Sequence, residues 1–234
     1  WFSPVAAEVG PDGNLWVADW YNFIIQHNPT PTIERGGYNA VRGIGNAHKN
    51  PLRDKQQGRI YRVIWEGAQA SSISSLEGAS KKQLLNALSH HNQFWRLTAQ
   101  RLIVARKLTE LTPSLKALLK NSSGIPASHA LWTLDGLGTL DKESHQFALL
   151  KAGDPILKRN AIRAIPTDEA GRQLFFDTAV VQAKDPLVRL TAFAKLAHFS
   201  DKEENEQIAN RLILDGENNS DEWLATALRA SGAG

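Results

Sequence analysis

The segments "GDPILKRNAIRAI" (residues 153–165) and "KDPLVRLTAFAKL" (184–196) are two versions of one pattern, 31 residues apart. Two segments nearer the N-terminus show the same pattern at the same spacing: "NQFWRLTAQRLI" (92–103) and "SGIPASHALWTL" (123–134). One column of this alignment holds only alanine: Ala99, Ala130, Ala161 and Ala192. Two apolar columns keep the same phase: Phe94, Ile125, Ile156 and Leu187, and Ile103, Leu134, Ile165 and Leu196. Several columns that share one period indicate a structural repeat.

A further apolar column predicts a second helix before each of these segments. Its residues keep the same spacing: Leu88, Leu119, Leu150, Val181 and Leu212. A fifth unit follows the inserted loop "DGENNSD" (215–221), where Ala227 stands 35 residues beyond Ala192. Apolar columns at helical spacing, with a small alanine where two helices approach, predict a mainly α fold. We expect a HEAT/armadillo-like α-solenoid of about five helix pairs over residues 80–234.

Helix start signals support this prediction. Asp154-Pro155 and Asp185-Pro186 each place an N-capping carboxylate before a proline, which suits the first helical turn. The period is shorter than the roughly 40 residues of a usual HEAT repeat, so we expect a short HEAT-like form. A TPR-like solenoid is the alternative, but its Trp-Leu-Gly-Tyr signature is missing.

Residues 1–67 follow a different pattern. "PVAAEV" (4–9), the turn "GPDG" (10–13) and "LWVADW" (15–20) predict a β-hairpin, and "GRIYRVIW" (58–65) predicts a further strand. The stretch between them, 27–57, is loop by composition. Three strands need a cover for their apolar face, so we expect them to belong to a larger β-domain. The chain begins at Trp1 within an apparent strand and contains no methionine, so we expect a processed chain or a fragment.

Two motifs of this segment carry a family resemblance. "VAAEVGPDGNLWVADWYNFIIQH" (5–27) followed by "NPLRDKQQGRIYRV" (50–63) resembles the last β-propeller blade of large secreted proteins of planctomycetes and Bacteroidetes. Those proteins are described as membrane-bound dehydrogenases with a haem-binding domain. In them the propeller is followed by helical repeats and then by a cytochrome-like domain with a CxxCH motif.

The resemblance implies a domain organisation and a setting. Residues 1–67 would be the remnant of a terminal propeller blade with a long loop, 68–79 a linker, and 80–234 the helical repeats. The longer protein would be a periplasmic or secreted sugar or sorbosone-type dehydrogenase, with haem c and a quinone or calcium as cofactors. This chain has no cysteine and hence no CxxCH motif, so we expect no cofactor within it.

Composition excludes several classes of function. Without cysteine there is no disulfide, thiolate nucleophile or Cys-ligated zinc in these residues. Lysine and arginine number 27 against 24 acidic residues, and a net charge of +3 is far from the excess of a dedicated nucleic-acid binder. No run approaches the roughly 18 apolar residues of a membrane-spanning helix.

Six residues of the first segment are candidates for contact with a substrate or cofactor: Asp19, Tyr21, Asn22, Arg53, Asp54 and Lys55. In one interpretation the first three line a propeller mouth, and the "RDK" motif presents charges to a polar ligand. In the alternative, which we favour, Asp19 accepts backbone hydrogen bonds at a turn while Arg53 and Asp54 pair to fix the loop. Neither motif contains a nucleophile–base pair, so no catalytic residue is predicted.

Two basic columns of the repeat are candidates for an interaction surface: Arg96, Lys158 and Arg189, and Arg101 and Arg163. A basic stripe on a solenoid can bind phosphate groups, as in HEAT-like DNA glycosylases. Those enzymes are wholly helical, however, whereas this chain also has a β segment. The usual role of charge on a helix surface is solvation. Adjacent His90 and His91 project about 100° apart on a helix, a poor geometry for one metal. Trp95, Trp132 and Trp223 are expected to pack in the core or between repeats.

These observations lead to three hypotheses about function. The first is a non-catalytic scaffold or protein-interaction segment of a larger secreted, dehydrogenase-like protein, whose partners are the other domains of that protein or a redox partner. The second is a part of the catalytic sugar dehydrogenase propeller itself. The third, a HEAT-like DNA-binding protein, requires a continuous basic concave surface.

Overall fold

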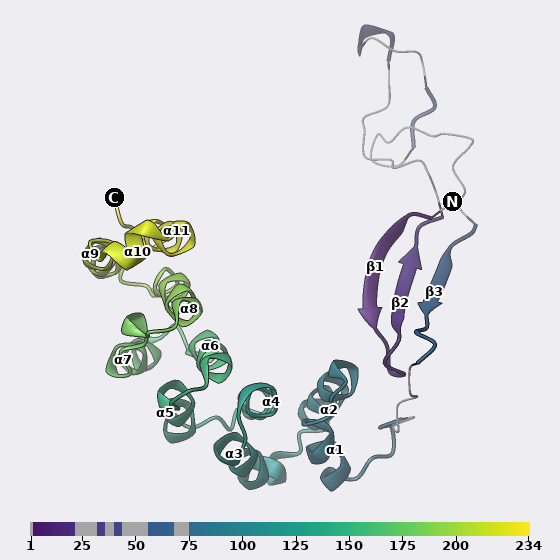
Figure 1. Cartoon of the computed structure of the whole chain (residues 1–234), viewed down its shortest axis with the longest axis horizontal. Helices are drawn as coiled ribbons and strands as arrows, with labels where there is room; N and C mark the ends of the chain where they lie inside the picture. The colour runs from purple at the N-terminus through teal and green to yellow at the C-terminus, as the bar shows by residue number, and fades with distance from the viewer. Residues whose placement is uncertain (1, 22–31, 36–39, 44–55, 68–74) are drawn as a thin grey trace. The chain divides into compact units, whose positions relative to one another are not determined.

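The computed structural model describes residues 2–21, 32–35, 40–43, 56–67 and 75–234. The chain is mainly helical, with a small antiparallel sheet near its N-terminus. It divides into two compact units, Trp1–Ser74 and Ser75–Gly234 (Figure 1). Each unit is described by itself.

The first unit is built on three antiparallel strands in the order β1 (Pro4–Val9), β2 (Leu15–Asp19) and β3 (Arg59–Val63). A short 3₁₀ helix, η1 (Ile33–Arg35), lies between β2 and β3 in the sequence. The predicted hairpin is confirmed, because β1 pairs with β2 across the "PDG" turn. Gly13 has φ of 82°, a left-handed conformation that glycine adopts without strain. The turn is closed by the Gly10 amide, which donates to the Asn14 carbonyl at 2.9 Å.

One face of this sheet is apolar and uncovered among the described residues. The strand register places Val9, Leu15 and Val63 side by side, with Tyr61 on the same face. All four side chains are exposed, and only Val17 on this face is a buried apolar residue of the strands. A three-stranded sheet needs a covered apolar face for stability, so this face is suited to packing against further structure.

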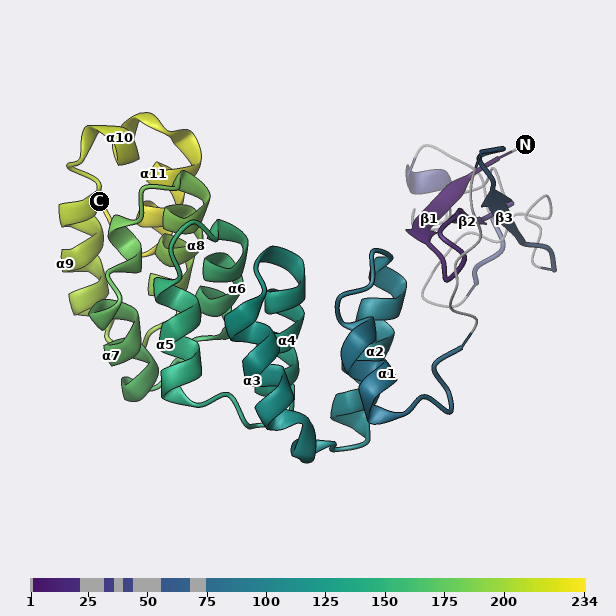
Figure 2. The same ribbon diagram turned by 60° about the horizontal axis from the view of Figure 1, so that its bottom comes forward.

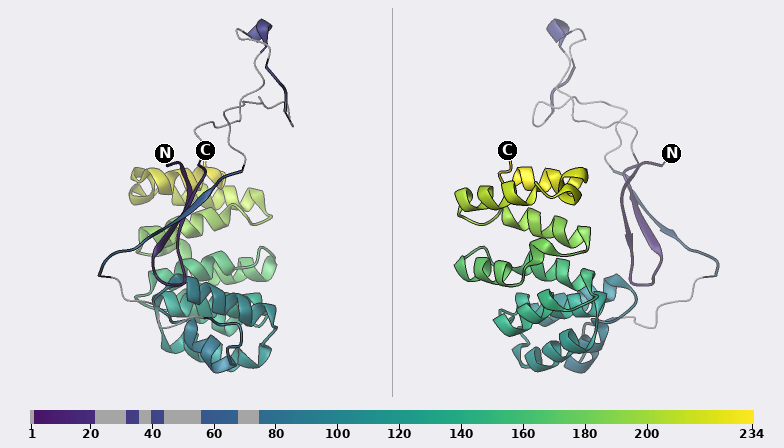
Figure 3. Two further views of the ribbon diagram at one scale, coloured as in Figure 1. Left: turned by 90° about the vertical axis from the view of Figure 1, so that its right-hand side faces the viewer. Right: turned by 60° about the vertical axis from the view of Figure 1, so that its left-hand side comes forward.

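The second unit consists of helices joined by short connections. These are α1 (Lys81–Ala87), α2 (Gln93–Ala105), α3 (Thr112–Asn121), α4 (Gly124–Gly136), α5 (Lys142–Leu150), α6 (Pro155–Ala164), α7 (Glu169–Asp177), α8 (Pro186–Leu196), α9 (Lys202–Leu212), α10 (Gly216–Ser220) and α11 (Glu222–Ala230), with the 3₁₀ helices η3 (Thr109–Leu111) and η4 (Val180–Gln182). They pack as consecutive pairs with roughly parallel axes, each pair beside the one before it (Figures 2 and 3).

The pairs form two layers. The inner layer consists of α2, α4, α6, α8 and α11, each of which contacts the next. The outer layer consists of α1, α3, α5, α7 and α9. The helical unit curves, and the inner layer lies on the inside of the curve (Figure 1).

The alanine column lies at the centre of the inner layer. Ala99, Ala130, Ala161 and Ala192 are each 0% exposed, which confirms their predicted place at the approach of two helices. The column of Ile103, Leu134, Ile165 and Leu196 is also buried. A methyl group is the largest side chain that leaves neighbouring helix backbones free to approach closely, which accounts for alanine at all four positions.

The apolar columns differ in burial, and the fifth unit aligns differently from the prediction. The column of Phe94, Ile125, Ile156 and Leu187 is exposed, because each residue is the second of its helix and lies at the helix end. Leu150 is also exposed, and its neighbour Leu149 is buried instead. In the fifth unit the cap residue Asp221 lies 36 residues beyond Asp185, so the fully buried Leu228, not Ala227, takes the place of Ala192.

Capping carboxylates start α6 and α8, as the two Asp-Pro pairs predict. Asp154 accepts from the Leu157 amide at 3.0 Å, and Asp185 accepts from the Leu187 and Val188 amides at 2.9 and 3.0 Å. Asp154 does more than cap its own helix. Its second oxygen accepts from the amide of Gly124, the first residue of α4, at 2.9 Å. One buried carboxylate therefore caps two neighbouring helices, and the cap residue of α4 itself, Ser123, makes no side-chain capping bond.

We predict that Asp154→Ala destabilises the helical unit more than Asp185→Ala. Loss of an N-cap costs about 1 kcal/mol, and Asp154→Ala should reach about 2 kcal/mol because it also leaves the Gly124 amide without its partner. The measurement is urea unfolding followed by circular dichroism at 222 nm. Equal losses in the two variants would show that the bond between α4 and α6 adds no stability.

Candidate functional site

Asp19, at the end of β2, joins all three strands. One carboxylate oxygen accepts from the backbone amides of Ser3 and Tyr21 at 2.7 and 3.1 Å. The other accepts from the guanidinium of Arg59 on β3, at 2.8 Å from Nε and 2.7 Å from Nη2. Burial acts to raise the pKa of Asp19, but these hydrogen bonds outweigh it and hold the pKa below its ordinary value.

This geometry gives Asp19 a structural role. The Asp19 side chain is fully buried and both carboxylate oxygens accept hydrogen bonds, so it has little capacity left for a ligand. The Arg59 guanidinium also lies 4.1 Å from the centre of the Tyr21 ring, which draws Tyr21 into the same cluster. The other sequence candidates, Asn22, Arg53, Asp54 and Lys55, lie outside the described residues.

Two members of the first basic column, Arg96 and Arg189, form hydrogen bonds to backbone carbonyls of their own repeat. The Arg96 guanidinium donates to the carbonyls of His90 and His91 at 2.6 and 2.7 Å. Arg189 makes the equivalent bonds to the carbonyls of Ala183 and Lys184, at 3.0 and 3.2 Å. Each arginine thus secures the connection that precedes its own helix.

The remaining members of the basic columns lie nearer the surface. Lys158 is half-buried, and Arg101 and Arg163 are exposed. Arg163 lines a groove with two further cations, Arg159 and Lys195, and no acidic residue, whereas the pocket beside Arg189 also contains Asp215 and Glu217.

A polar network links α2 with α4. Arg96 Nε donates to His129 Nε2 at 3.2 Å, which leaves the proton of a neutral imidazole on Nδ1, 2.8 Å from Gln100 Oε1. Burial, with repulsion from Arg96, lowers the pKa of His129 to about 4. His129 is therefore neutral at pH 7 and serves as a hydrogen-bonded link between two inner helices.

The predicted packing of the tryptophans is confirmed at two positions and wrong at the third. Trp95 is buried, and Trp132 donates from Nε1 to Asn160 Oδ1 at 2.9 Å, a bond between α4 and α6. Trp223 is 71% exposed. It is the second residue of α11, the position that Phe94 and Leu187 occupy in their own helices.

Five exposed apolar side chains therefore share one position, the second residue of each inner helix. We call them the apolar row: Phe94 (38% exposed), Ile125 (47%), Ile156 (47%), Leu187 (51%) and Trp223 (71%). The sequence pattern identified four of them as a repeat column, but the pattern does not indicate that the column is exposed. Scattered exposed apolar residues are ordinary, whereas a repeated line of them marks a surface suited to contact with another molecule.

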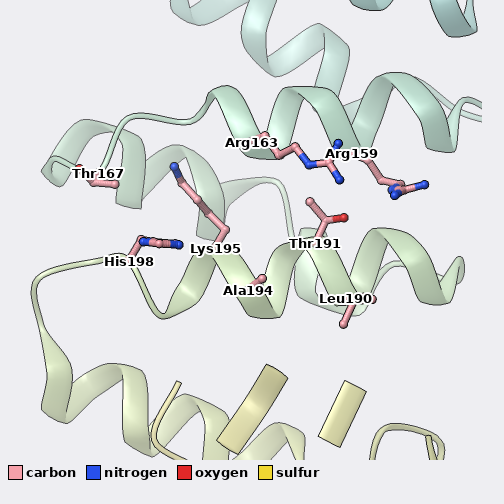
Figure 4. Close-up of a pocket in the computed structure, with 8 residues that line it drawn as sticks. All are labelled: Arg159, Arg163, Thr167, Leu190, Thr191, Ala194, Lys195 and His198. Carbon is pink, nitrogen blue, oxygen red and sulfur yellow. The ribbon is translucent and has the colours of Figure 1, made fainter. Parts of the chain in front are cut away.

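A groove of about 420 Å³ lies between α6 and α8 (Figure 4). Arg159 and Arg163 extend from α6 toward it, and Lys195 extends from α8. The hydroxyl groups of Thr167 and Thr191 add polar character, and no acidic residue lines the groove. We call this the basic groove.

Sequence reasoning identified only Arg163 of this groove. A signal for the rest was present, because residues 155–167 and 186–200 hold five basic residues and no acidic one. Which of these five face one another depends on helix packing. Lys158 and Arg189 turn out to lie away from the groove, whereas Arg159 and Lys195 line it.

In the described ranges, no group of three His, Cys, Asp or Glu side chains is arranged to hold a metal ion. Within those ranges, none of the helices combines the length and apolar composition needed to span a bilayer.

Comparison with known proteins bears on the first unit. Residues 1–67 match a domain of unknown function (DUF7133). The match covers the three strands and ends before α1. No curated protein matches the chain.

We predict that Asp19→Asn loosens the first unit. The amide loses the charge that binds Arg59, so the backbone amides of Ser3 and Tyr21 should exchange with solvent at least about tenfold faster at pH 7, a change of about 1.4 kcal/mol in local opening. Hydrogen exchange measures this, with a substitution at an exposed residue of β1, Glu8→Gln, as the control.

The protection of these amides in the wild type should be constant above about pH 4, the ordinary pKa of Asp. It should fall as the pH drops through the lowered pKa of Asp19. Unchanged exchange in Asp19→Asn would contradict the structural role.

A second prediction concerns His129 and pH. Its pKa is about 4 in the folded chain and about 6.5 when unfolded, so between these values the unfolded chain binds more protons and stability falls as the pH falls. Glutamine keeps hydrogen-bonding groups but does not titrate. The drop in urea midpoint from pH 7 to pH 4.5 should therefore be smaller in His129→Gln than in the wild type. Equal drops would mean that His129 is not held neutral by its site.

Proposed function

We propose that the helical unit is a HEAT-like α-solenoid and that the chain is a non-catalytic scaffold, binding a protein segment along its inner layer. The observation that carries this proposal is the apolar row. Five consecutive inner helices present a large apolar side chain at the same position, on the same layer of the unit. Repeat proteins use such inner surfaces to bind extended partners.

The apolar row favours a protein partner on energetic grounds. Burial of apolar surface contributes roughly 25 cal/mol per Å², so five half-exposed side chains offer a useful binding contribution once a partner covers them. Aliphatic side chains such as Ile125, Ile156 and Leu187 gain from contact with other apolar side chains, whereas nucleotide bases stack on aromatic rings. The inward bonds of Arg96 and Arg189 further weaken the case for a continuous basic stripe that binds DNA.

We also propose that the chain is part of a larger secreted, dehydrogenase-like protein that oxidises a sugar or related alcohol. Two observations support this. The motifs at 5–27 and 50–63 resemble the terminal propeller blade of such proteins. The apolar sheet face of Val9, Leu15, Tyr61 and Val63 is suited to packing against a neighbouring blade. In this arrangement the helical repeats position the propeller relative to a haem-bearing or carbohydrate-binding module.

Photo-crosslinking in the longer gene product tests the scaffold function. We predict that benzoylphenylalanine at Leu187 or Ile156 cross-links to one protein segment, identified by mass spectrometry, because both positions belong to the apolar row. The control position is Leu214, which is 83% exposed but lies outside the row. Cross-linking at the level of Leu214, or to nucleic acid alone, would contradict a protein-binding row.

A dye-linked sugar oxidation assay with haem staining tests the non-catalytic assignment. The 234-residue chain should show no turnover, and the longer gene product should carry both the activity and the haem. Turnover by this chain alone would overturn the assignment.

A further inference from the structure

The described residues provide no counterion for the cations of the basic groove. Arg172 and Arg189 are each paired with a glutamate, Glu204 and Glu217 respectively, at 2.5 and 3.4 Å. Among the described residues, no carboxylate lies within 4.0 Å of the charged groups of Arg159, Arg163 or Lys195.

Two of these groove cations are also partly removed from water. Arg159 Nε is buried and has no hydrogen-bond partner among the described residues. Lys195 donates to the carbonyl of Ile165, a neutral acceptor, and burial lowers its pKa. A partly desolvated cation without a counterion is costly, so an anion in this groove would be stabilised.

The two arginines are spaced for a shared ligand. Arg159 and Arg163 stand four residues apart, which places them one turn apart on one face of α6. Both line the groove between α6 and α8, and Lys195 extends from α8 toward the C-terminal end of α6 at the other end of the groove (Figure 4). Guanidinium groups bind carboxylates through two parallel hydrogen bonds, and the Thr191 and Thr167 hydroxyls offer further polar contacts.

Apolar side chains adjoin the basic groove on the same two helices. Ile156 precedes Arg159 by three residues on α6, and Leu187 precedes Leu190 and Thr191 by three and four residues on α8. These spacings put the apolar row and the groove on one face of each helix. Ile156 and Arg163 are seven positions apart, a rise of about 10 Å along the helix, which equals about three residues of an extended peptide.

We propose that the basic groove binds acidic side chains of the partner segment, whose neighbouring apolar side chains contact Ile156 and Leu187. This inference rests on the proposed scaffold function and specifies its ligand as a peptide that combines carboxylates with apolar residues about three positions away. A nucleic acid is the weaker candidate. Proteins that depend on phosphate contacts make about six to ten of them, and the groove supplies three cations beside aliphatic side chains.

Fluorescence anisotropy on the full 234-residue chain tests the proposal. The probe is a labelled 12-residue synthetic peptide with two leucines, each followed three residues later by a pair of glutamates. Its first analogue replaces glutamate by glutamine, and its second replaces leucine by serine. A labelled 20-residue oligothymidylate represents nucleic acid. The protein variants are Arg163→Glu, Arg163→Gln and the matched control Arg101→Glu, which changes an exposed arginine two repeats earlier in the same column.

We expect the glutamate peptide to bind at least tenfold more tightly than the glutamine analogue. Arg163→Glu should weaken binding at least tenfold and Arg163→Gln at least threefold, whereas Arg101→Glu should change it less than twofold. The serine analogue should also bind more weakly, because it loses the contacts with Ile156 and Leu187. Unchanged helical circular dichroism would show that the variants are folded.

Several results would overturn the proposal. These are equal binding of the glutamate and glutamine peptides, equal losses in Arg163→Glu and Arg101→Glu, and tighter binding of oligothymidylate than of the peptide. Self-association that is lost in Arg163→Glu would also overturn it, because the occupant would then be a second copy of the chain, through residues 201–222, which hold eight acidic residues. Cross-linking at Leu187 is a separate measurement. If it succeeds while the glutamate dependence is absent, the scaffold function stands and the groove assignment fails.

Discussion

The close approach of the inner helices at Ala99, Ala130, Ala161 and Ala192 is the contact on which the helical unit depends. Each helix pair buries its apolar face only against its neighbours, so the stability of the unit depends on these successive contacts. The alanines are fully buried, and the column of Ile103, Leu134, Ile165 and Leu196 is buried beside them. Polar bonds between repeats add to this packing, notably Asp154 to the Gly124 amide and Trp132 to Asn160.

The same packing determines what the inner layer exposes. Because α2, α4, α6 and α8 are each held at the same point by an alanine, and α11 by Leu228, the residues at the start of each helix recur in the same place and form the apolar row. Residues that extend from two adjacent inner helices can line one groove, as Arg159, Arg163 and Lys195 do. A repeat whose buried positions are fixed by packing thus also has a regular exposed surface. Substitutions at single exposed positions can adapt this surface to a ligand.

Much of the fold was predictable from the sequence, because the 31-residue period and the Asp-Pro pairs report on backbone structure directly. The period does not distinguish a buried column from an exposed one. Phe94 and Leu187 recur as regularly as Ala99 and Ala192, and their exposure follows from their place at the helix start. Arg96 and Arg163 likewise belong to recurring basic columns, yet one binds loop carbonyls and the other faces a groove. Only side-chain packing decides between these two outcomes.

In the first unit, strand pairing brings Arg59 to Asp19 across 40 residues of sequence. No local sequence motif predicts this contact.

The central claim is that a protein segment covers the apolar row in the longer gene product. Hydroxyl-radical footprinting tests this claim most directly, by comparing the oxidation rates of Phe94, Leu187 and Trp223 in the isolated 234-residue chain and in the longer protein. Leu214 provides the reference rate in both. We predict that the row is oxidised readily in the isolated chain and is protected in the longer protein, with Leu214 unchanged. Equal oxidation of the row in the two proteins would contradict the claim.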